Sequence, residues 1–560
     1  MGLGLLAATL LPPGNAGAQI VGSKHDLSVS GQGPVKSSGE SEVCIFCHTP
    51  HNAAPATPLW NRTLPSLTYT PYSSSTLQSQ PGQPTGASKL CLSCHDGTIA
   101  LGSVLSRAAP IPMTGALPPH SDLTTDLSDD HPVSFVYDSS LAAADPEIVD
   151  PTLLPQGIRT DPNGQLQCTS CHEPHSNLHG DFLVVANGFS ALCLACHEKV
   201  GWPGSAHETS SATWNGAGVD PWPHTDEITV AANGCENCHA PHAAGSAQWL
   251  LNELREEDNC LACHEGTVAT LDIGGELQKP FRHPVGAFLG LHHPEEDPRQ
   301  MPRHVECEDC HDPHAATQGS AFPPDVSGPL VGASGVSASG SPVAVASFQY
   351  EVCFACHAEG AGVPPPGVTR QILEPSLRLK LDASNPSFHP VEAPGRNPSV
   401  PSLLSPLSEA SLIYCTDCHA SDDGPGSGGS GPAGPHGSIW PALLEREYRT
   451  GDGTSESFQA YALCYKCHDR SSILGNQSFS EHRKHIVGER APCSACHDPH
   501  GISVTEGDAT HNSHLINFDV DIVSPNPSNG RLEFVDLGIR TGKCSLECHG
   551  ERHDDKSYRP

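Results

Sequence analysis

Apolar residues are spread thinly along the chain and seldom form long periodic runs. The range 246–260 has helical apolar spacing and predicts one helix. Near the C-terminus, residues 519–523 and 531–535 flank Asn529-Gly530, which predicts a β-hairpin. The stretches 319–347 and 421–438 are rich in Gly, Ser, Pro and Ala and are expected to be loops or linkers. The pattern therefore predicts few regular elements between long irregular segments.

The N-terminal segment carries the one short apolar run that predicts a targeting signal. Leu3 to Leu11 is apolar, and Ala16-Gly17-Ala18 forms an A-x-A cleavage pattern before Gln19. Residues 1–18 are therefore expected to be a signal peptide. No cysteine follows the cleavage pattern, so no lipid anchor is expected, and no run reaches the ~18 apolar residues of a membrane span. These features predict export, to the periplasm or the outer surface of a Gram-negative-type bacterium.

The composition does not favour large protein cores. The 560 residues include 54 Gly and 53 Pro, and aromatic residues make up only 5%. The chain also carries 63 acidic against 29 basic residues, a formal net charge of -34. Nucleic acid and anionic lipid are poor partners for such a surface because both are negatively charged.

The cysteines follow one rule throughout the chain. All 24 fall into pairs, and a histidine follows the second cysteine of every pair. Eleven strings read C-x-x-C-H, and the twelfth is the stretched Cys544-Ser545-Leu546-Glu547-Cys548-His549. Numbered in chain order as sites 1 to 12, they are Cys44/Cys47/His48, Cys91/Cys94/His95, Cys168/Cys171/His172, Cys193/Cys196/His197, Cys235/Cys238/His239, Cys260/Cys263/His264, Cys307/Cys310/His311, Cys353/Cys356/His357, Cys415/Cys418/His419, Cys464/Cys467/His468, Cys493/Cys496/His497 and Cys544/Cys548/His549.

The string C-x-x-C-H is the attachment signal for a c-type haem, whose vinyl groups form thioethers with the two thiols while the histidine is the proximal iron ligand. Zinc ribbons or disulfides would leave the residue after the second cysteine free to vary, and here it never varies. We therefore expect twelve covalently attached haem c groups per chain. The predicted fold is mostly irregular coil, with short helices and few strands, wrapped around a chain of closely packed haems that takes the place of a core.

Two kinds of string alternate along the chain and predict repeated two-haem modules. Sites 1, 3, 5, 7 and 11 read C-H-x-P-H, whereas the others lack the second histidine. Site 9 departs from this alternation, and Pro435-His436-Gly437 is its nearest equivalent. Each string is expected on a single helical turn that the proline ends. The expected organisation is a region 19–318 with seven sites, a linker 319–347 and a region 348–560 with five sites.

Histidine is the only abundant candidate for the second, distal iron ligand, because the chain has 34 His and 3 Met. Bis-histidine ligation predicts low reduction potentials. The two histidines of C-H-x-P-H leave one side of a turn, so the second is expected to bind the iron of a neighbouring haem. The candidate distal ligands are His51, His175, His242, His314 and His500 from the strings, with His436 in place of the missing member at site 9, His131, His224, His283, His389 and His485 between the strings, and His25 and His514 at the ends, with His207, His304 and His553 in reserve.

Several phrases besides these strings resemble one family, the doubled-CXXCH multihaem cytochromes of metal-reducing and other anaerobic bacteria. They are Lys24-His25-Asp26-Leu27-Ser28, Cys47-His48-Thr49-Pro50-His51-Asn52, Pro58-Leu59-Trp60-Asn61-Arg62, the three His-Pro-Val strings and His514-Leu515-Ile516-Asn517-Phe518. The resemblance implies a periplasmic or outer-surface electron carrier. Some similar proteins polymerise into filaments that conduct electrons to minerals or partner cells.

We therefore expect an exported electron carrier and not an enzyme. Its expected partners are other redox proteins or extracellular electron acceptors, or further copies in a filament, in which His25 would reach across the junction. One alternative is a multihaem reductase for nitrite, hydroxylamine or tetrathionate, which needs an open iron often marked by C-x-x-C-K. The sequence has no such string. A second alternative is the cytochrome subunit of a porin-bound conduit in the outer membrane.

Overall fold

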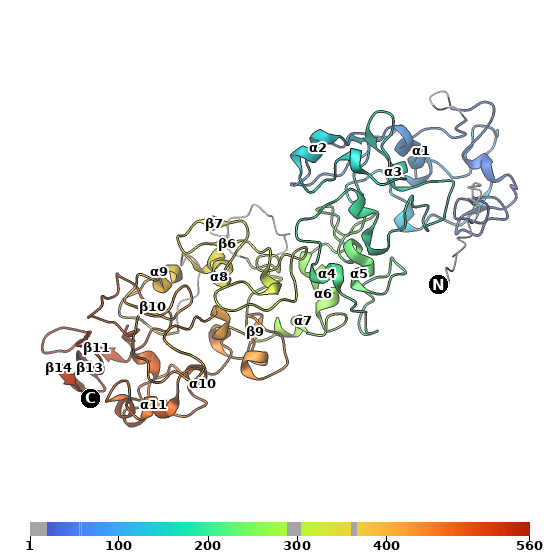
Figure 1. Ribbon diagram of the computed structural model, residues 1–560. Coiled ribbons are helices and arrows are strands. Elements are labelled where there is room, and N and C mark those ends of the chain that lie inside the picture. Colours follow the sequence, from blue (N-terminus) through green and yellow to red (C-terminus); the bar gives the residue numbers. More distant parts are fainter. Residues whose placement is uncertain (1–19, 55–56, 58, 288–303, 360–366, 560) are drawn as a thin grey trace, which may run out of the picture. The chain divides into compact units, whose positions relative to one another are not determined.

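The computed structural model describes residues 20–54, 57, 59–287, 304–359 and 367–559, and the expected signal peptide lies outside these ranges. Irregular backbone dominates, and the helices and strands are short (Figure 1). This confirms the predicted content of coil, short helices and few strands. The chain forms two compact units: unit 1 comprises residues up to 200 together with 222–254, and unit 2 comprises residues 201–221 and 255–560.

Unit 1 contains four short α-helices and two antiparallel strand pairs within its described residues. The helices are α1 (Gly86–His95), α2 (Ser139–Ala144), α3 (Cys168–Cys171) and α5 (Val230–Asn233). Strand β1 (Lys36–Ser37) pairs with β2 (Met113–Thr114), and β3 (Phe135–Val136) pairs with β4 (Gln165–Leu166). Its 3-10 turns are Val43–Phe46, Pro119–Ser121, Pro151–Leu153, Gly188–Ser190, Cys193–Ala195 and Gly234–Asn237.

Unit 2 has the same character over a longer stretch of chain. Its helices are α4 (Ala206–Thr209), α6 (Glu256–His264), α7 (Ile273–Glu276), α8 (Gln349–His357), α9 (Leu377–Leu381), α10 (Ala462–Tyr465) and α11 (Arg470–Leu474). Its 3-10 turns are Gly328–Leu330, Cys415–Asp417, Pro425–Ser427, Pro441–Leu443 and Cys493–Ala495, and one π turn spans Lys484–Gly488. Three isolated strand pairs are β5 (Phe281–Arg282) with β9 (Gly437–Ser438), β6 (Gly335–Val336) with β7 (Pro342–Val343), and β8 (Ser387–Phe388) with β10 (Gly501–Ile502).

The largest sheet among the described residues lies at the C-terminal end of unit 2. Its central strand is β13 (Gly542–Cys548), which pairs antiparallel with β11 (Val523–Ser524), β12 (Glu533–Asp536) and β14 (Glu551–Tyr558). The sequence predicts a hairpin between residues 519–523 and 531–535, and this prediction is wrong. The turn at Asn529-Gly530 is present, but the strands on either side of it both pair with β13.

Apolar packing is divided among small clusters. One cluster joins Ala495, Phe518 and Phe534 to the C-terminal sheet, and another packs Tyr350 and Phe354 of α8 against Leu381 of α9. Cysteines of the strings pack against several of these clusters, so the clusters lie beside the sites.

Two buried arginines bind the backbone carbonyls around sites. Arg62 is fully buried, and its guanidinium donates to the carbonyls of Ser93 and Leu101, near the end of α1. Arg370 donates to the carbonyls of Ser494, His497 and Asn517 at 2.7 to 2.8 Å. Such carbonyls have no helical partner, so a charged donor satisfies them where water is excluded.

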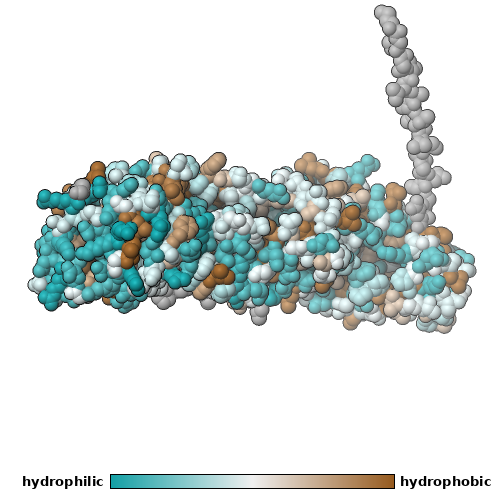
Figure 2. Space-filling view, turned by 90° about the horizontal axis from the view of Figure 1, so that it is seen from below, coloured by the Kyte–Doolittle hydropathy of each residue, from teal (hydrophilic) through white to brown (hydrophobic). Residues whose placement is uncertain are grey.

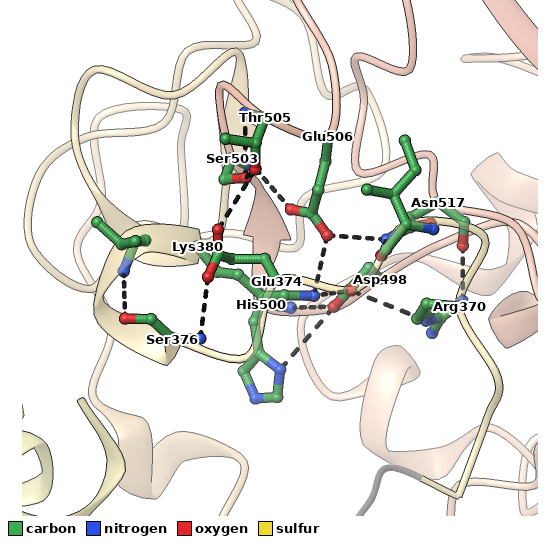
Figure 3. A network of polar contacts seen from close by, with 12 residues as sticks. Arg370, Glu374, Ser376, Lys380, Asp498, His500, Ser503, Thr505, Glu506 and Asn517 are labelled. Carbon is green, nitrogen blue, oxygen red and sulfur yellow. Dashed lines mark hydrogen bonds and ion pairs between the residues drawn. The ribbon is translucent and has the colours of Figure 1, made fainter. Parts of the chain in front are cut away.

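Arg370 is also part of a buried ion network (Figure 3). Lys380 lies 2.5 Å from Asp498 and 3.3 Å from Glu506, and all three side chains are at most 9% exposed. The positive charges of Lys380 and Arg370 balance the negative charges of Asp498 and Glu506. The network lies directly beside the C-H-x-P-H string of site 11, because Asp498 is the variable residue of that string and His500 its second histidine.

Two further expectations can be compared with the fold. The helix predicted over 246–260 is wrong in its first half: α6 begins at Glu256, and Trp249 and Leu250 have positive φ of 55°. Residues 319–347, expected to be a linker, contain a 3-10 turn and the β6–β7 pair, and β6 packs on α8. The predicted boundary there stays a prediction.

Hydrophilic residues predominate on the face shown in Figure 2, and hydrophobic residues are scattered among them. In the part of the chain that the structure describes, no helix has the length and apolar character needed to cross a membrane.

Candidate haem-binding sites

Eleven of the twelve strings share one backbone conformation. At each of these sites the residues lie on an α-helical, 3-10 or similar hydrogen-bonded turn, and outside the longer helices the histidine N–H donates to the carbonyl of the first cysteine at 2.8 to 3.0 Å. The turn places both thiols and the imidazole on one side of the backbone. This is the arrangement that covalent attachment to one porphyrin requires.

The turns that carry the strings differ in length from site to site, as Cys238 and Cys356 illustrate. Cys238 of site 5 lies one residue beyond the 3-10 turn Gly234–Asn237, and its N–H donates to the carbonyl of Cys235 at 3.2 Å. Cys356 of site 8 instead lies inside α8, a helix of nine residues. A short 3-10 turn ends just before the second cysteine at site 5, as at sites 1, 4, 9 and 11, whereas α1, α6 and α8 carry their strings on helices of nine or ten residues.

All cysteines except the exposed Cys44 are of intermediate exposure. Cys238 and Cys356 are both of intermediate exposure, and none of the 24 cysteines forms a disulfide. The carbonyl of Cys238 accepts the N–H of Asn252 at 2.8 Å, which holds site 5 against the segment that follows it. The attachment of haem to these two cysteines, as to the other 22, stays a prediction.

Site 12 differs, because Cys544 and Cys548 lie in strand β13. At about 3.3 Å per residue, four residues of strand span about 13 Å, whereas one helical turn rises only about 5.4 Å. Its histidine, His549, lies 2.9 Å from the Asp452 carboxylate. The stretched string is therefore the one site whose backbone does not match the others.

The proximal histidines face a second imidazole across a narrow gap. Within the described ranges, nine of them have ring centroids 5.9 to 6.4 Å from another histidine: His48–His175, His95–His25, His172–His242, His197–His131, His264–His207, His311–His436, His357–His283, His419–His500 and His497–His482. Two imidazoles that ligate one metal at about 2 Å each have centroids about 6.3 Å apart. The gap therefore fits one iron atom.

Burial keeps these imidazoles neutral. Desolvation lowers the pKa of His131, His264, His436, His468, His497 and His500 to about 4 and that of His482 to about 3. Only neutral imidazole offers a lone pair to a metal, so these side chains are in the binding form at pH 7.

Backbone carbonyls orient the proximal rings. The Nδ1 atoms of His172, His239, His419 and His497 lie 2.8 to 3.1 Å from the carbonyl oxygens of Asp181, Trp249, Ala442 and His514. Next to each of these carbonyls is a non-glycine residue with positive φ: Phe182, Leu250, Leu443 and Leu515. The left-handed residue turns the chain back toward the string. The apolar run that predicted a helix at 246–260 is one of these turns.

The proline of C-H-x-P-H, or Pro435 in place of it for site 9, orients a distal ring of the preceding site. The carbonyl oxygens of Pro174, Pro313, Pro435 and Pro499 are partners of the Nδ1 atoms of His25, His207, His283 and His389. At site 5 the carbonyl of Pro241 instead accepts the backbone N–H of His131 at 2.8 Å. Partners on Nδ1 leave Nε2 as the ligating nitrogen. The sequence predicted only that this proline ends a helical turn, and the contact of its carbonyl with a distal histidine was not predicted.

Some candidate distal residues are placed differently from the sequence-based expectation. His207, held in reserve, faces His264, whereas His224 is exposed and its Nε2 contacts the Glu236 carbonyl. His514 binds Asp536 through Nε2 and orients His497 through its carbonyl. His25, expected at a junction between copies, faces His95 of its own unit.

The remaining candidates lie near other groups. His485 faces the reserve residue His553 at 6.2 Å, and His389 lies near His468. His314 lies 3.6 Å from Asp312, and His304 lies 3.5 Å from Glu306. His51 is exposed.

Consecutive sites are neighbours in space within each unit. In unit 1 the Cys91 thiol interacts with the Cys168 thiol, and the Cys193 thiol interacts with the Cys235 thiol. Burial raises the pKa of the Cys47 thiol to about 12, and the neighbouring Cys94 thiol contributes to the rise. The pKa of Cys171 is raised in the same way to about 12 by burial and by the neighbouring Cys196 thiol. In unit 2 the same relation joins Cys310 to Cys353 and Cys356, Cys353 to Cys415, Cys418 to Cys467, Cys464 to Cys493 and Cys496 to Cys544. The order of sites in the sequence is thus their order in space from site 1 to 5 and from site 7 to 12.

One site also has a visible cavity. Cys168 and His242 line it together with Leu92, Leu127 and Val133, and its empty volume is about 440 Å³. Its largely apolar lining suits a porphyrin.

Comparison with known families supports the same chemistry. Residues 161–201 and 229–269 each match the model of the doubled CXXCH motif. Each matched segment contains a C-H-x-P-H string followed by a simple string, sites 3 and 4 in the first and sites 5 and 6 in the second. No curated protein matches the chain. The doubled motifs imply covalently bound haem c and indicate a multihaem c-type cytochrome.

Proposed function

We propose that the protein is an exported dodecahaem cytochrome that carries electrons along a chain of bis-histidine haems to an acceptor outside the cytoplasm. Haem c supplies one-electron chemistry at its iron when bound. The cysteines hold each group covalently, the paired imidazoles supply both axial ligands, and the carbonyls on Nδ1 fix the rings. Low potentials follow from two nitrogen ligands.

The observation that carries this proposal is the contact between consecutive sites through their cysteines. Thioether positions that touch bring neighbouring macrocycles into contact as well, and contact is what electron transfer between them needs. Paired imidazoles at nine sites favour a carrier over a reductase for nitrite, hydroxylamine or tetrathionate, since a reductase needs an iron open to substrate. The acidic surface favours cationic redox partners.

The proposal is tested by two measurements on the full chain. Alkaline pyridine haemochrome against protein mass is expected to give twelve haems per chain. The electron paramagnetic resonance spectrum of the ferric protein is expected to be low-spin. A large high-spin fraction, or stoichiometric binding of nitrite or hydroxylamine, would favour the enzyme.

Self-assembly is a further part of the proposed function, and His51 is its candidate residue. The corresponding histidines His175 and His242 each face the proximal histidine two sites earlier, at sites 1 and 3. His51 is exposed and, among the described residues, faces no other imidazole. We propose that it completes an iron of a neighbouring copy in a filament.

Negative-stain microscopy of the native protein and of His51→Ala tests this assembly. Filaments lost in the variant would support it, and His224→Ala is the matched control because His224 is also exposed. Single particles in the native protein at high concentration would exclude the filament.

A further inference from the structure

Carboxylates lie beside the second histidine of several C-H-x-P-H strings. The Nδ1 atoms of His175 and His242 are each 3.1 Å from a carboxylate oxygen, of Glu173 and Asp130 respectively. His314 and His500 have Asp312 and Asp498 at 3.6 and 3.9 Å. In three of these four strings the acid is the variable residue of the string itself.

Site 5 is the exception, and it shows that the carboxylate can come from elsewhere. Its variable residue is Ala240, which has no polar group, yet Asp130 reaches His242 from 112 positions away in the sequence. Two unrelated chain segments thus place the same group on the same ring nitrogen. A carboxylate at this position is therefore a feature of the imidazole's surroundings and not a by-product of the local turn.

The carboxylate of Asp130 is fixed in place. Its residue is 4% exposed, and Oδ1 also accepts the N–H of Ala243 at 3.2 Å. Two backbone hydrogen bonds join the same segments: Ala244 N–H donates to the carbonyl of Asp129, and His131 N–H to that of Pro241. Asp130 and His242 also share the lining of the cavity that contains Cys168.

We propose that Asp130 is a positioning residue for site 3, which holds the Nδ1–H of His242 and lowers the reduction potential of the iron bound between His172 and His242. This inference rests on the proposed bis-histidine ligation. A carboxylate acceptor fixes the tautomer that presents Nε2 to the metal and makes the imidazole more basic. A more basic ligand stabilises ferric over ferrous iron, so the potential falls.

The test is Asp130→Asn in the haem-loaded full chain, which keeps the shape of the side chain and removes its charge. The signal of site 3 in the paramagnetic resonance spectrum is identified as the low-spin signal that His242→Ala abolishes. In Asp130→Asn this signal is expected to persist with shifted g-values. Its preference for ferric iron is expected to fall about tenfold, which raises its midpoint by about 59 mV.

Two further variants separate this role from packing or general charge. Asp129→Asn removes a neighbouring carboxylate that does not bind Nδ1, and it is expected to leave the site 3 signal unchanged. Adding Ala240→Glu to Asp130→Asn restores an acid at the position that Glu173 occupies in site 3, and it is expected to return the midpoint toward that of the native protein.

Each outcome decides the proposal. An unshifted low-spin signal in Asp130→Asn overturns it, and so does an equal shift in Asp129→Asn, which would show a long-range charge effect. Loss of the signal in Asp130→Asn supports positioning if Ala240→Glu restores it and overturns the proposal if it does not. If instead the native site 3 is high-spin, the proposed function itself fails.

Discussion

His207→Ala is expected to open a single iron, that of site 6. The His207 ring lies 6.3 Å from His264, its Nδ1 lies 2.8 Å from the carbonyl oxygen of Pro313, and Ser205 caps the short helix α4 that carries it. Removal of this imidazole leaves the metal position with one axial nitrogen, that of His264. One of twelve sites is about 8% of the iron, so this fraction is expected to become high-spin.

The assay is quantitative paramagnetic resonance of the ferric protein, normalised to pyridine haemochrome. His224→Ala is the control, because this histidine lies in the same stretch between sites, is exposed, and contacts the carbonyl of Glu236 through Nε2. His207→Met retains a ligand, so it is expected to stay low-spin with a raised midpoint at one iron. A high-spin signal in His224→Ala and none in His207→Ala would refute the pairing.

Three other predictions concern stability and attachment. Lys380→Met is expected to lower the free energy of unfolding by about 3 to 5 kcal/mol in thermal or denaturant unfolding, because it removes the nearer of the two cations, Lys380 and Arg370, that face the buried Asp498. A loss below about 1 kcal/mol would contradict the role of the network. Burial raises the pKa of Glu392 to about 7, so folding takes up a proton there and the free energy of unfolding falls as pH rises from about 4.5 to 7. Glu392→Gln is therefore expected to stabilise the protein at pH 8 but not at pH 4. Equal effects of the substitution at both pH values would argue against a raised pKa at Glu392. Peptide mass spectrometry is expected to find haem on the peptide with Cys544 and Cys548, because His485 and His553 leave a metal-sized gap near strand β13; an unmodified peptide would reduce the count to eleven.

The strings could be predicted from the sequence because their geometry is local. Thioether spacing and the following histidine fit within one turn, and eleven sites adopt such a turn, which at sites 2, 6 and 8 is the end of a longer helix. The same rule failed at site 12, where the extra residue allows Cys544 to Cys548 to extend as a strand that three other segments pair with.

The distal ligands depend on contacts between distant segments and could be predicted only in part. His175 and His242 follow from the geometry of C-H-x-P-H. His207 and His224 are equivalent in the sequence, and the packing of His207 on Pro313, 106 residues away, separates them. The turn at Trp249-Leu250, whose carbonyl orients His239, could not be predicted from the sequence either. An apolar pair in left-handed backbone has the same spacing in the sequence as an apolar pair on a helix.

The direction in which each site finds its second imidazole has a consequence for a chain that emerges N-terminus first. Sites 2, 4, 6 and 8 take theirs from upstream, so both ligands are present once the string itself has emerged. Sites 1, 3, 7 and 9 take theirs from later in the chain and wait for that segment, which is a later string at sites 1, 3 and 9 and the His436 segment at site 7. A chain cut after site 10 would lack His500 and would therefore end near an open coordination position at site 9. Shortening such a protein there would leave the iron of site 9 without its second imidazole.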